Sequence, residues 1–198
     1  MLSWGFGIAI GLGCLVEYES TPGRAANCPL DWPANHEFQL SPGRINIIML
    51  AHPRCPCTRA SLDQLQGLIV DLKDRVTADV FFWMPSVANN DWKETDLWRK
   101  AMSIPGLHVH ADEGGAEAKR LGAATSGQVV IYRDDGTWLF SGGVTDARGR
   151  FGDSQGAAAI RKLVSDGTNP RSEITPVFGC PLFRSDSTCI EGTQSCPK

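Results

Sequence analysis

The sequence lacks a strong net charge and any long basic run: 19 Lys and Arg residues face 22 Asp and Glu residues, for a formal net charge of -3. Such a chain has no general attraction for a phosphate backbone, so we expect no nucleic-acid partner. Internal repeats and low-complexity segments are also absent, and hydrophobic residues make up an ordinary 42%. This usage excludes a collagen-like repeat, wholesale disorder and a polytopic membrane protein. The 198 residues fit one compact domain with terminal extensions.

Cysteine, in contrast, is frequent for a cytosolic chain of this size. Thiols are kept reduced in the cytosol, whereas disulfides form and persist in oxidising compartments. The composition therefore favours an exported protein. The seven cysteines are Cys14, Cys28, Cys55, Cys57, Cys180, Cys189 and Cys196.

The N-terminal segment, residues 1–18, is apolar, with no charge from Leu2 to Val16. This run is too short to be a comfortable membrane span. No basic residue precedes it and no clear cleavage site follows it, so a short membrane anchor is favoured over a signal peptide. A buried apolar helix would give the same pattern. We expect a protein anchored in the inner membrane, with the membrane as a partner and the domain facing the periplasm, or a secreted protein.

Three further segments follow the apolar stretch. Residues 19–43 are rich in proline and small polar residues without a sustained period, which is typical of a linker. Residues 44–165 carry the patterns of a folded domain, and residues 166–198 form a tail rich in cysteine and proline. Apolar runs and helical periods predict strands at 44–51, 78–84, 107–111, 128–132 and 137–143, and helices at 57–74, 95–102, 115–121 and 157–164.

The order of these elements predicts a mixed α/β fold. Residues 44–51 are mostly apolar, as in a central strand buried on both faces. Asp135 and Gly136 form a dipeptide that supplies the positive φ of a tight turn, so the strands at 128–132 and 137–143 should be antiparallel neighbours.

The sharpest motif is His52-Pro53-Arg54-Cys55-Pro56-Cys57-Thr58-Arg59, at the junction of the first strand and the first long helix. The first turn of a helix carries unpaired N–H groups and the positive end of the macrodipole, which stabilise a thiolate and lower its pKa. We therefore predict Cys55 as an exposed nucleophile, with Arg54 and Arg59 adding positive charge. Pro56 fits the first turn, where its missing N–H would have no intrahelical partner.

Cys57 is two residues away, so the pair can close a C-x-C disulfide through a tight ring. Strain in such a ring raises the reduction potential and makes the bond labile, which favours a redox-active disulfide over a structural one. Two alternatives stay open. The two thiols can bind a metal together with His52, or each can bridge to a distant cysteine.

The residues around this motif resemble the thioredoxin-like superfamily. Residues 47–51 and 54–60 are similar to the strand, thiol loop and helix of membrane-tethered thioredoxins, and residues 110–136 resemble a stretch of the cytochrome-maturation thioredoxins and of peroxiredoxins. More narrowly, residues 51–57 with 175–180 resemble a bacterial group of anchored proteins with a CPC motif, sometimes labelled RedB. The resemblance covers residues 44–164. It implies a thioredoxin-like fold with a central mixed sheet flanked by helices and an inserted αβ unit.

Three departures from the family pattern bear on the mechanism. The resemblance puts Cys55 on the attacking cysteine but Thr58 on the resolving one. Gly127 stands where the superfamily has a cis-proline that lines the substrate groove, which leaves room for a metal ion or a different substrate backbone. A peroxiredoxin has Thr or Ser three residues before its nucleophile, where this chain has His52.

The remaining cysteines lie mostly in the tail, where disulfides can supply order that packing does not. Structural bridges among them are the default expectation, and the sequence does not rank the pairings. Cys180 is a candidate resolving partner, because its neighbours Val177 to Pro181 can dock beside the active loop. The four candidates for structural disulfides are Cys28, Cys180, Cys189 and Cys196.

These observations predict an exported thiol–disulfide oxidoreductase in which Cys55 attacks a substrate disulfide and Cys57 resolves the mixed disulfide. We expect a protein thiol or disulfide as substrate, no cofactor and no resident metal. One alternative is a copper-carrier-like protein that uses Cys55, Cys57 and His52 as soft ligands near Gly127. A peroxiredoxin-like peroxidase and a scaffold whose thiols are all structural are the others.

Overall fold

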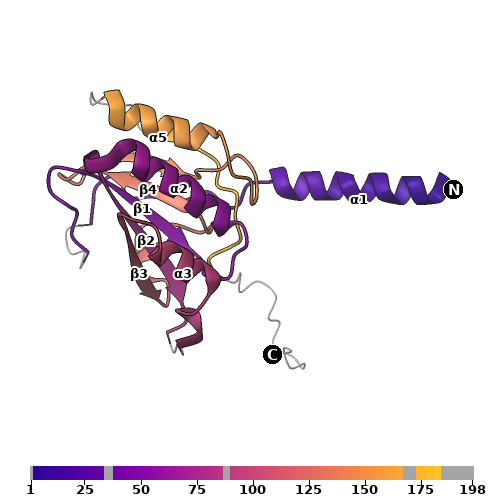
Figure 1. The fold of residues 1–198 in the computed structure, drawn as a ribbon, viewed down its shortest axis with the longest axis horizontal. Coiled ribbons are helices and arrows are strands. Elements are labelled where there is room, and N and C mark those ends of the chain that lie inside the picture. The colour runs from indigo at the N-terminus through magenta and orange to yellow at the C-terminus, as the bar shows by residue number, and fades with distance from the viewer. Residues whose placement is uncertain (1, 34–37, 87–89, 167–172, 184–198) are drawn as a thin grey trace.

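The structure is a computed structural model, and it describes residues 2–33, 38–86, 90–166 and 173–183 (Figure 1). Its centre is a six-stranded sheet with the order β3-β2-β1-β4-β5-β6. The first strand is therefore central, as predicted, and each expected strand is present. The strands are β1 (Ile45–Ala51), β2 (Val76–Met84), β3 (Leu107–Glu113), β4 (Gln128–Tyr132), β5 (Trp138–Gly142) and β6 (Glu173–Ile174).

The sheet is mixed. Strands β1, β2 and β3 are parallel, and β4 runs antiparallel to both β1 and β5, which confirms the predicted hairpin. The short β6 adds a parallel edge strand to β5. The helices are α1 (Leu2–Ser20), α2 (Thr58–Leu72), α3 (Asp96–Met102), α4 (Ala116–Arg120) and α5 (Gln155–Asp166), with short 3-10 turns at Lys73–Arg75 and Asn90–Trp92.

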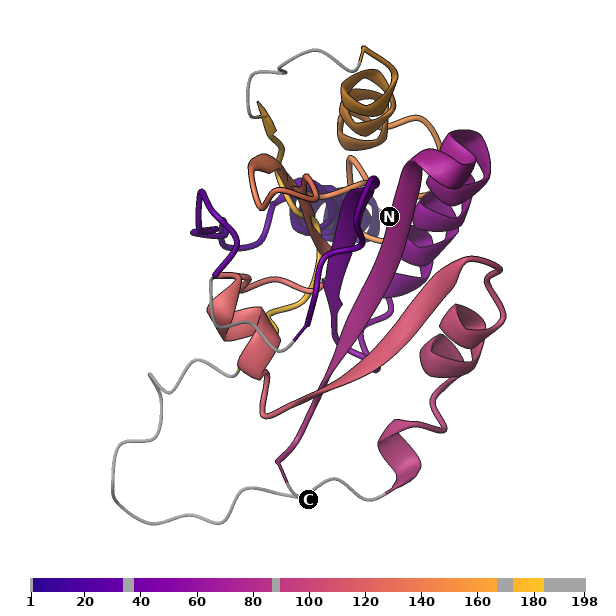
Figure 2. The same ribbon diagram turned by 90° about the vertical axis from the view of Figure 1, so that its left-hand side faces the viewer.

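Helices α2, α3 and α5 cover one face of the sheet (Figures 1 and 2). Side chains in a β-strand alternate between the two faces, so Ile47 and Met49 of β1 point to this side. They join one buried cluster with Leu65 of α2 and Ile160 of α5. The unit of α3 and β3 lies at the outer edge beyond β2, and it is the inserted αβ unit that the sequence predicted. Thr95 caps the N-terminus of helix α3, where its hydroxyl accepts a hydrogen bond from the N–H of Trp98.

The other face of the sheet is covered by α4 and by the segment between α1 and β1 (Figure 2). Trp32 and Phe38 of that segment pack against the cluster that contains Ile48 and Tyr132. The hydroxyl of Tyr132 donates a hydrogen bond to the carbonyl oxygen of Pro29 at 2.8 Å. The segment that the sequence presents as a linker therefore supplies part of the second core layer.

Helix α1 projects from the domain, with its apolar side chains exposed (Figure 1). None of the helices in the described part of the chain is long and apolar enough to cross a membrane. This overturns the prediction of a transmembrane anchor. The last turn of the helix carries Glu17 and Glu19, and charged side chains are costly inside a bilayer.

After β6 the chain runs on as an extended segment, residues 175–182, which we call the C-terminal strap. The strap first passes the end of β5, where the N–H of Gly143 donates to the carbonyl oxygen of Pro176 at 3.1 Å. It then reaches the loop before β4, where the N–H of Ser126 donates to the carbonyl oxygen of Cys180 at 2.8 Å. Part of the cysteine-rich tail is thereby brought to the carboxyl end of β1.

Candidate active site

The thiol loop joins β1 to α2 through two tight turns. The N–H of Cys55 donates to the carbonyl oxygen of His52, and the N–H of Thr58 donates to the carbonyl oxygen of Cys55, both at 3.1 Å. Cys57 is the residue that caps α2, and its side chain makes no capping hydrogen bond. Pro56 therefore precedes the helix rather than lying in its first turn. The loop places both cysteines at the N-terminus of α2, as the sequence predicted.

Three thiol groups lie close together at the N-terminus of α2. The sulfur atoms of Cys55, Cys57 and Cys180 all lie within 4.8 Å of one another. Cys55 is 2% exposed and Cys57 is 7% exposed, whereas Cys180 is only half-buried. The prediction that Cys55 is exposed is therefore wrong, because the strap brings Cys180 into contact with it.

Local hydrogen bonds decide the ionisation of Cys55. Burial alone would disfavour the thiolate, but the S–H and N–H of Cys180 and the hydroxyl and N–H of Thr58 donate to its sulfur, so the pKa of Cys55 falls below its ordinary value. Hydrogen bonds to the charged form of a group favour that form. Thr58, which stands at the position of the family's resolving cysteine, thus stabilises the neighbouring thiolate.

The other two thiols have shifts in the opposite direction. Burial and the negative charge of Cys55 raise the pKa of Cys57, partly offset by the guanidinium of Arg148, which donates a hydrogen bond to it. Burial and the donated hydrogen bond to Cys55 raise the pKa of Cys180 to about 12. Of the three thiols, Cys55 is therefore the one that ionises first.

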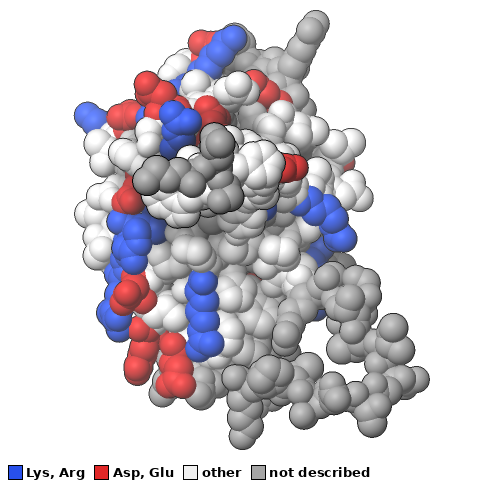
Figure 3. Space-filling view, turned by 90° about the vertical axis from the view of Figure 1, so that its right-hand side faces the viewer, with Lys and Arg blue, Asp and Glu red and all other residues white. Residues whose placement is uncertain are grey.

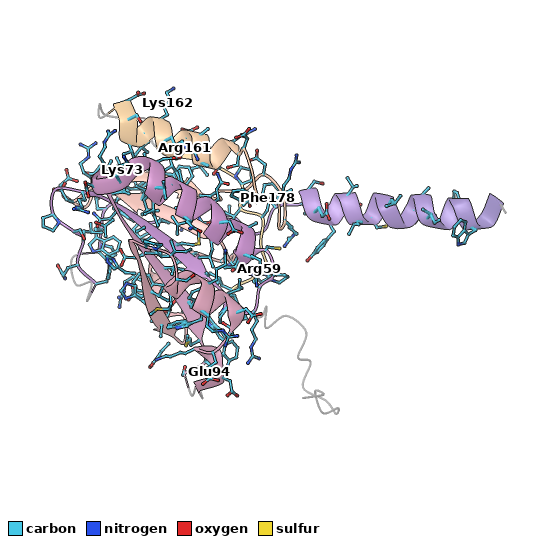
Figure 4. The ribbon with its side chains drawn as sticks, in the orientation of Figure 1. Arg59, Lys73, Glu94, Arg161, Lys162 and Phe178 are labelled. Atoms are coloured by element: carbon cyan, nitrogen blue, oxygen red, sulfur yellow. The ribbon has the colours of Figure 1, made fainter. Side chains whose placement is uncertain are left out.

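His52 and Arg54 face an aromatic group rather than the thiols. The imidazole of His52 stacks on Trp83 with ring centroids 5.3 Å apart, and the guanidinium of Arg54 lies 4.1 Å above the ring of Trp92. Burial and the charge of Arg54 lower the pKa of His52. Arg59 is exposed on the first turn of α2, at the end of the domain next to α1 (Figure 4). Arg54 and Arg59 thus lie near the thiols but in different surroundings.

Two buried hydroxyl groups stabilise the thiol loop through hydrogen bonds. The Oγ atoms of Thr58 and Ser126 lie 2.8 Å apart, and Ser126 also accepts the N–H of His52. Gly127 follows with a φ of +89°, and its N–H donates to the carbonyl oxygen of Leu50. A proline ring fixes φ near −65°, so the family's proline does not fit this backbone.

The remaining cysteines lie apart from this cluster. The sulfur of Cys28 is 3.1 Å from the Oγ of Ser141, and burial raises its pKa while that hydrogen bond opposes the rise. Cys14 is exposed on α1. Cys189 and Cys196 lie outside the described residues, so the predicted bridges in the tail concern a part of the chain that the structure does not describe.

Arg148 and Ser126 are the two site residues that sequence reasoning missed. Arg148 lies in the loop between β5 and α5, and it donates hydrogen bonds to Cys57, to the carbonyl oxygen of Tyr18 at 3.0 Å and to that of Gly179. No motif marks either residue, because both reach the thiol loop and the first turn of α2 from distant parts of the sequence. Only the resemblance of the stretch before β4 to the thioredoxins pointed to the neighbourhood of Ser126.

The cluster also has the chemistry of a soft-metal site. Thiolates are the ligands that Cu(I) prefers, and three sulfur atoms at this separation can reach one ion. His52 is not among the clustered residues, so the third ligand would be Cys180 and not His52, which the sequence predicted.

A pocket of about 360 Å³ adjoins the strap, with Arg24, Thr125, Arg148, Pro181 and Phe183 in its lining. Figure 3 shows the end of the domain from which α1 projects, where uncharged surface separates basic and acidic side chains.

The strand order β2-β1-β4-β5, with α2 between the first two strands and α5 after the last, gives the chain a thioredoxin-like fold. The chain is similar to an uncharacterized conserved protein from Geobacillus kaustophilus, with 17% identity, a TM-score of 0.58, and 84% of this chain and 94% of that chain covered. A hypothetical protein from Sinorhizobium meliloti has 18% identity, the same TM-score, and coverage of 82% and 93%.

A weaker similarity, with a TM-score of 0.47 and 15% identity, is to the exposed lipoprotein thioredoxin of Streptococcus pneumoniae, where 63% of this chain and 85% of that chain are covered. At these identities the likeness extends to the fold alone. No protein-family model matches the chain, and no curated protein sequence matches it.

Proposed function

We propose that this chain is a thiol–disulfide oxidoreductase in which Cys55 is the attacking thiolate. The observation that carries the proposal is the lowered pKa of Cys55 within a cluster of three thiols at the N-terminus of α2. The thiolate is the nucleophilic form of cysteine, so a depressed pKa raises the reactive fraction near neutral pH. The thioredoxin-like fold supports the proposal, because it places the reactive sulfur at a helix N-terminus.

The reaction balances with two thiols and one substrate disulfide. The thiolate of Cys55 attacks one sulfur of a substrate R–S–S–R′, forms the mixed disulfide with R and expels R′–S⁻. Cys57 then loses its proton to the departing thiolate and attacks the sulfur of Cys55. The bond between the two cysteines forms, R–S⁻ leaves, and the substrate has been reduced to two thiols. The same steps in reverse oxidise a substrate dithiol.

We assign a protein thiol or disulfide as the substrate, and an oxidising compartment outside the cytosol as the place of action. The support for this location is the number of cysteines, which is high for a chain kept reduced. At the end of the domain from which α1 projects, uncharged surface separates basic and acidic side chains, which suits contact with a protein (Figure 3).

The test is the reaction of the reduced full chain with oxidised glutathione, followed by acid quenching, alkylation and peptide mass spectrometry. We expect Cys55→Ser to abolish release of glutathione. Cys28→Ser removes a half-buried thiol outside the cluster and is the matched control, which should react at the rate of the unchanged chain. A Cys55→Ser chain that still exchanges at the full rate rules out the assignment.

The second candidate is a copper-binding protein, favoured by the approach of three sulfur atoms to within 4.8 Å. It predicts stoichiometric Cu(I) binding by the reduced chain, lost in Cys180→Ser, together with negligible exchange with glutathione. Hydrogen peroxide in place of glutathione tests the peroxidase alternative, for which Cys55 would have to be oxidised by peroxide faster than by a disulfide.

A further inference from the structure

The C-terminal strap is fixed on both sides of Cys180. Before it, the N–H of Gly23 donates to the carbonyl oxygen of Val177 at 2.8 Å, and Arg148 donates to that of Gly179. After it, the N–H of Leu182 donates to a carbonyl oxygen of the loop before β4 at 2.9 Å. Val177 and Leu182 are buried, and Phe178 lies at the same end of the domain as Arg59 (Figure 4). The position of Cys180 is therefore set by the fold.

The strap also approaches the loop before β4 more closely than a side chain at residue 179 would allow. A Cβ atom built on Gly179 would lie 1.9 Å from the carbonyl oxygen of Ser126. Thr125 and Pro181 pair as an antiparallel bridge beside this contact. The glycine thus allows the backbone on either side of it to come close enough for the sulfur of Cys180 to reach Cys55.

Exposure to solvent distinguishes the three cysteine residues. Cys55 and Cys57 are almost completely buried, whereas Cys180 is half-buried and is flanked by two residues that line the 360 Å³ pocket, Gly179 and Pro181. Both the N–H and the S–H of Cys180 are directed at the sulfur of Cys55. The most exposed of the three cysteines is thus also in direct contact with the sulfur of Cys55.

We propose that Cys180 is a third redox residue, which forms a disulfide with Cys55 inside the chain. This inference rests on the proposed function, because the oxidant is the substrate disulfide. Cys55 attacks the substrate and expels one thiolate, which takes the proton of Cys180; the Cys180 thiolate then attacks the sulfur of Cys55 and expels the second thiolate. Cys57 can later attack Cys55 and release Cys180, which takes the proton of Cys57. That last exchange moves the disulfide to the C-x-C pair with no net oxidation.

The first experiment uses Cys57→Ser in the full chain, oxidised with glutathione disulfide, alkylated and digested with trypsin. Cys55 then lies in the peptide 55–59 and Cys180 in the peptide 172–184. We expect these two peptides to be linked as the main product. A persistent glutathione adduct on Cys55, with Cys180 alkylated, would overturn the proposal while leaving Cys55 as the nucleophile. A Cys55 that reacts with nothing would instead overturn the proposed function.

The second experiment moves the strap without removing a thiol. In Gly179→Ala the added Cβ clashes with Ser126, so the strap must shift near Cys180. We expect the linked product in the Cys57→Ser background to form about tenfold more slowly, and Cys55 to be alkylated about tenfold faster. Gly67→Ala, on α2 with open space around its Cβ, is the control and should change neither rate. Equal rates in the two variants would contradict the proposal.

Discussion

The guanidinium of Arg148 donates a hydrogen bond to the sulfur of Cys57, although the two residues lie in different loops at opposite ends of the domain's sequence. The same side chain also donates hydrogen bonds to the carbonyl oxygens of Tyr18 and Gly179. One arginine therefore connects the base of α1, the C-terminal strap and the thiol loop. Its positive charge is the main influence that counteracts the raised pKa of Cys57.

Arg148→Ala should make Cys57 a weaker acid. Loss of the positive charge removes a group that lowers the pKa of Cys57, so the pH profile of its alkylation should move to higher pH. The measurement is the alkylation rate of Cys57 against pH in a Cys55→Ser background. Arg148→Lys keeps the charge and should show a smaller shift. Arg150→Ala, at an exposed position two residues further on, is the control, and a shift of equal size there would refute the role given to Arg148.

His52 should make the protein less stable in mild acid. Burial and Arg54 depress the pKa of His52 in the folded state, so protonation favours the unfolded chain. This contribution to stability is present above the ordinary pKa of histidine and is lost as the pH falls through the lower folded value. Urea unfolding between pH 7 and pH 4 should show a smaller loss in His52→Gln than in the unchanged chain. An equally steep loss in the two proteins would show that another group governs the acid unfolding.

Tyr132 should limit stability at alkaline pH. Burial is the main cause that raises its pKa, followed by the nearby Cys28 and Asp31, so deprotonation above the ordinary pKa of tyrosine favours the unfolded state. Tyr132→Phe removes the hydrogen bond to Pro29 and should cost about 1 kcal/mol at pH 7. The variant should, however, lose less stability than the unchanged chain as the pH rises above 10.

The control for this experiment is Tyr18, which is exposed and is the only other tyrosine of the sequence. Urea midpoints at neutral and alkaline pH should therefore be the same for Tyr18→Phe and the unchanged chain. If Tyr132→Phe loses stability with rising pH as steeply as Tyr18→Phe, another buried group governs the alkaline unfolding.

Gly127→Ala should destabilise the fold by about 2 kcal/mol. The residue has a φ of +89°, and its added Cβ would lie 2.9 Å from the Oγ of Ser61. Gly43 has a φ of +70° with open space around it, so Gly43→Ala measures the backbone strain alone and should cost about 1 kcal/mol. Chemical denaturation gives both values. Ser61→Ala added to Gly127→Ala should restore part of the lost stability. Added to Gly43→Ala, it should restore none.

Hydrophobic patterns in the sequence were sufficient to predict the strands and helices of the domain. The apolar run of β1 and the Leu spacing of α2 predicted both elements to within two residues at each end, because local patterning matches the burial of each face. The segment before β1 shows no period, yet Trp32 and Phe38 pack on the sheet. Irregular segments of this kind contribute single anchoring side chains, and a periodic analysis does not detect them.

The sequence by itself determined the two thiols at the start of α2, since a strand-to-helix junction places Cys55 and Cys57 at a helix N-terminus whatever the rest of the chain does. Tertiary structure alone decided their surroundings. Cys180 and Arg148 come from an irregular strap and a loop, and their contacts depend on backbone pairing that no local pattern encodes. The ionisation and burial of a thiol depend on the groups within a few ångströms of it, and here those groups come from distant parts of the chain.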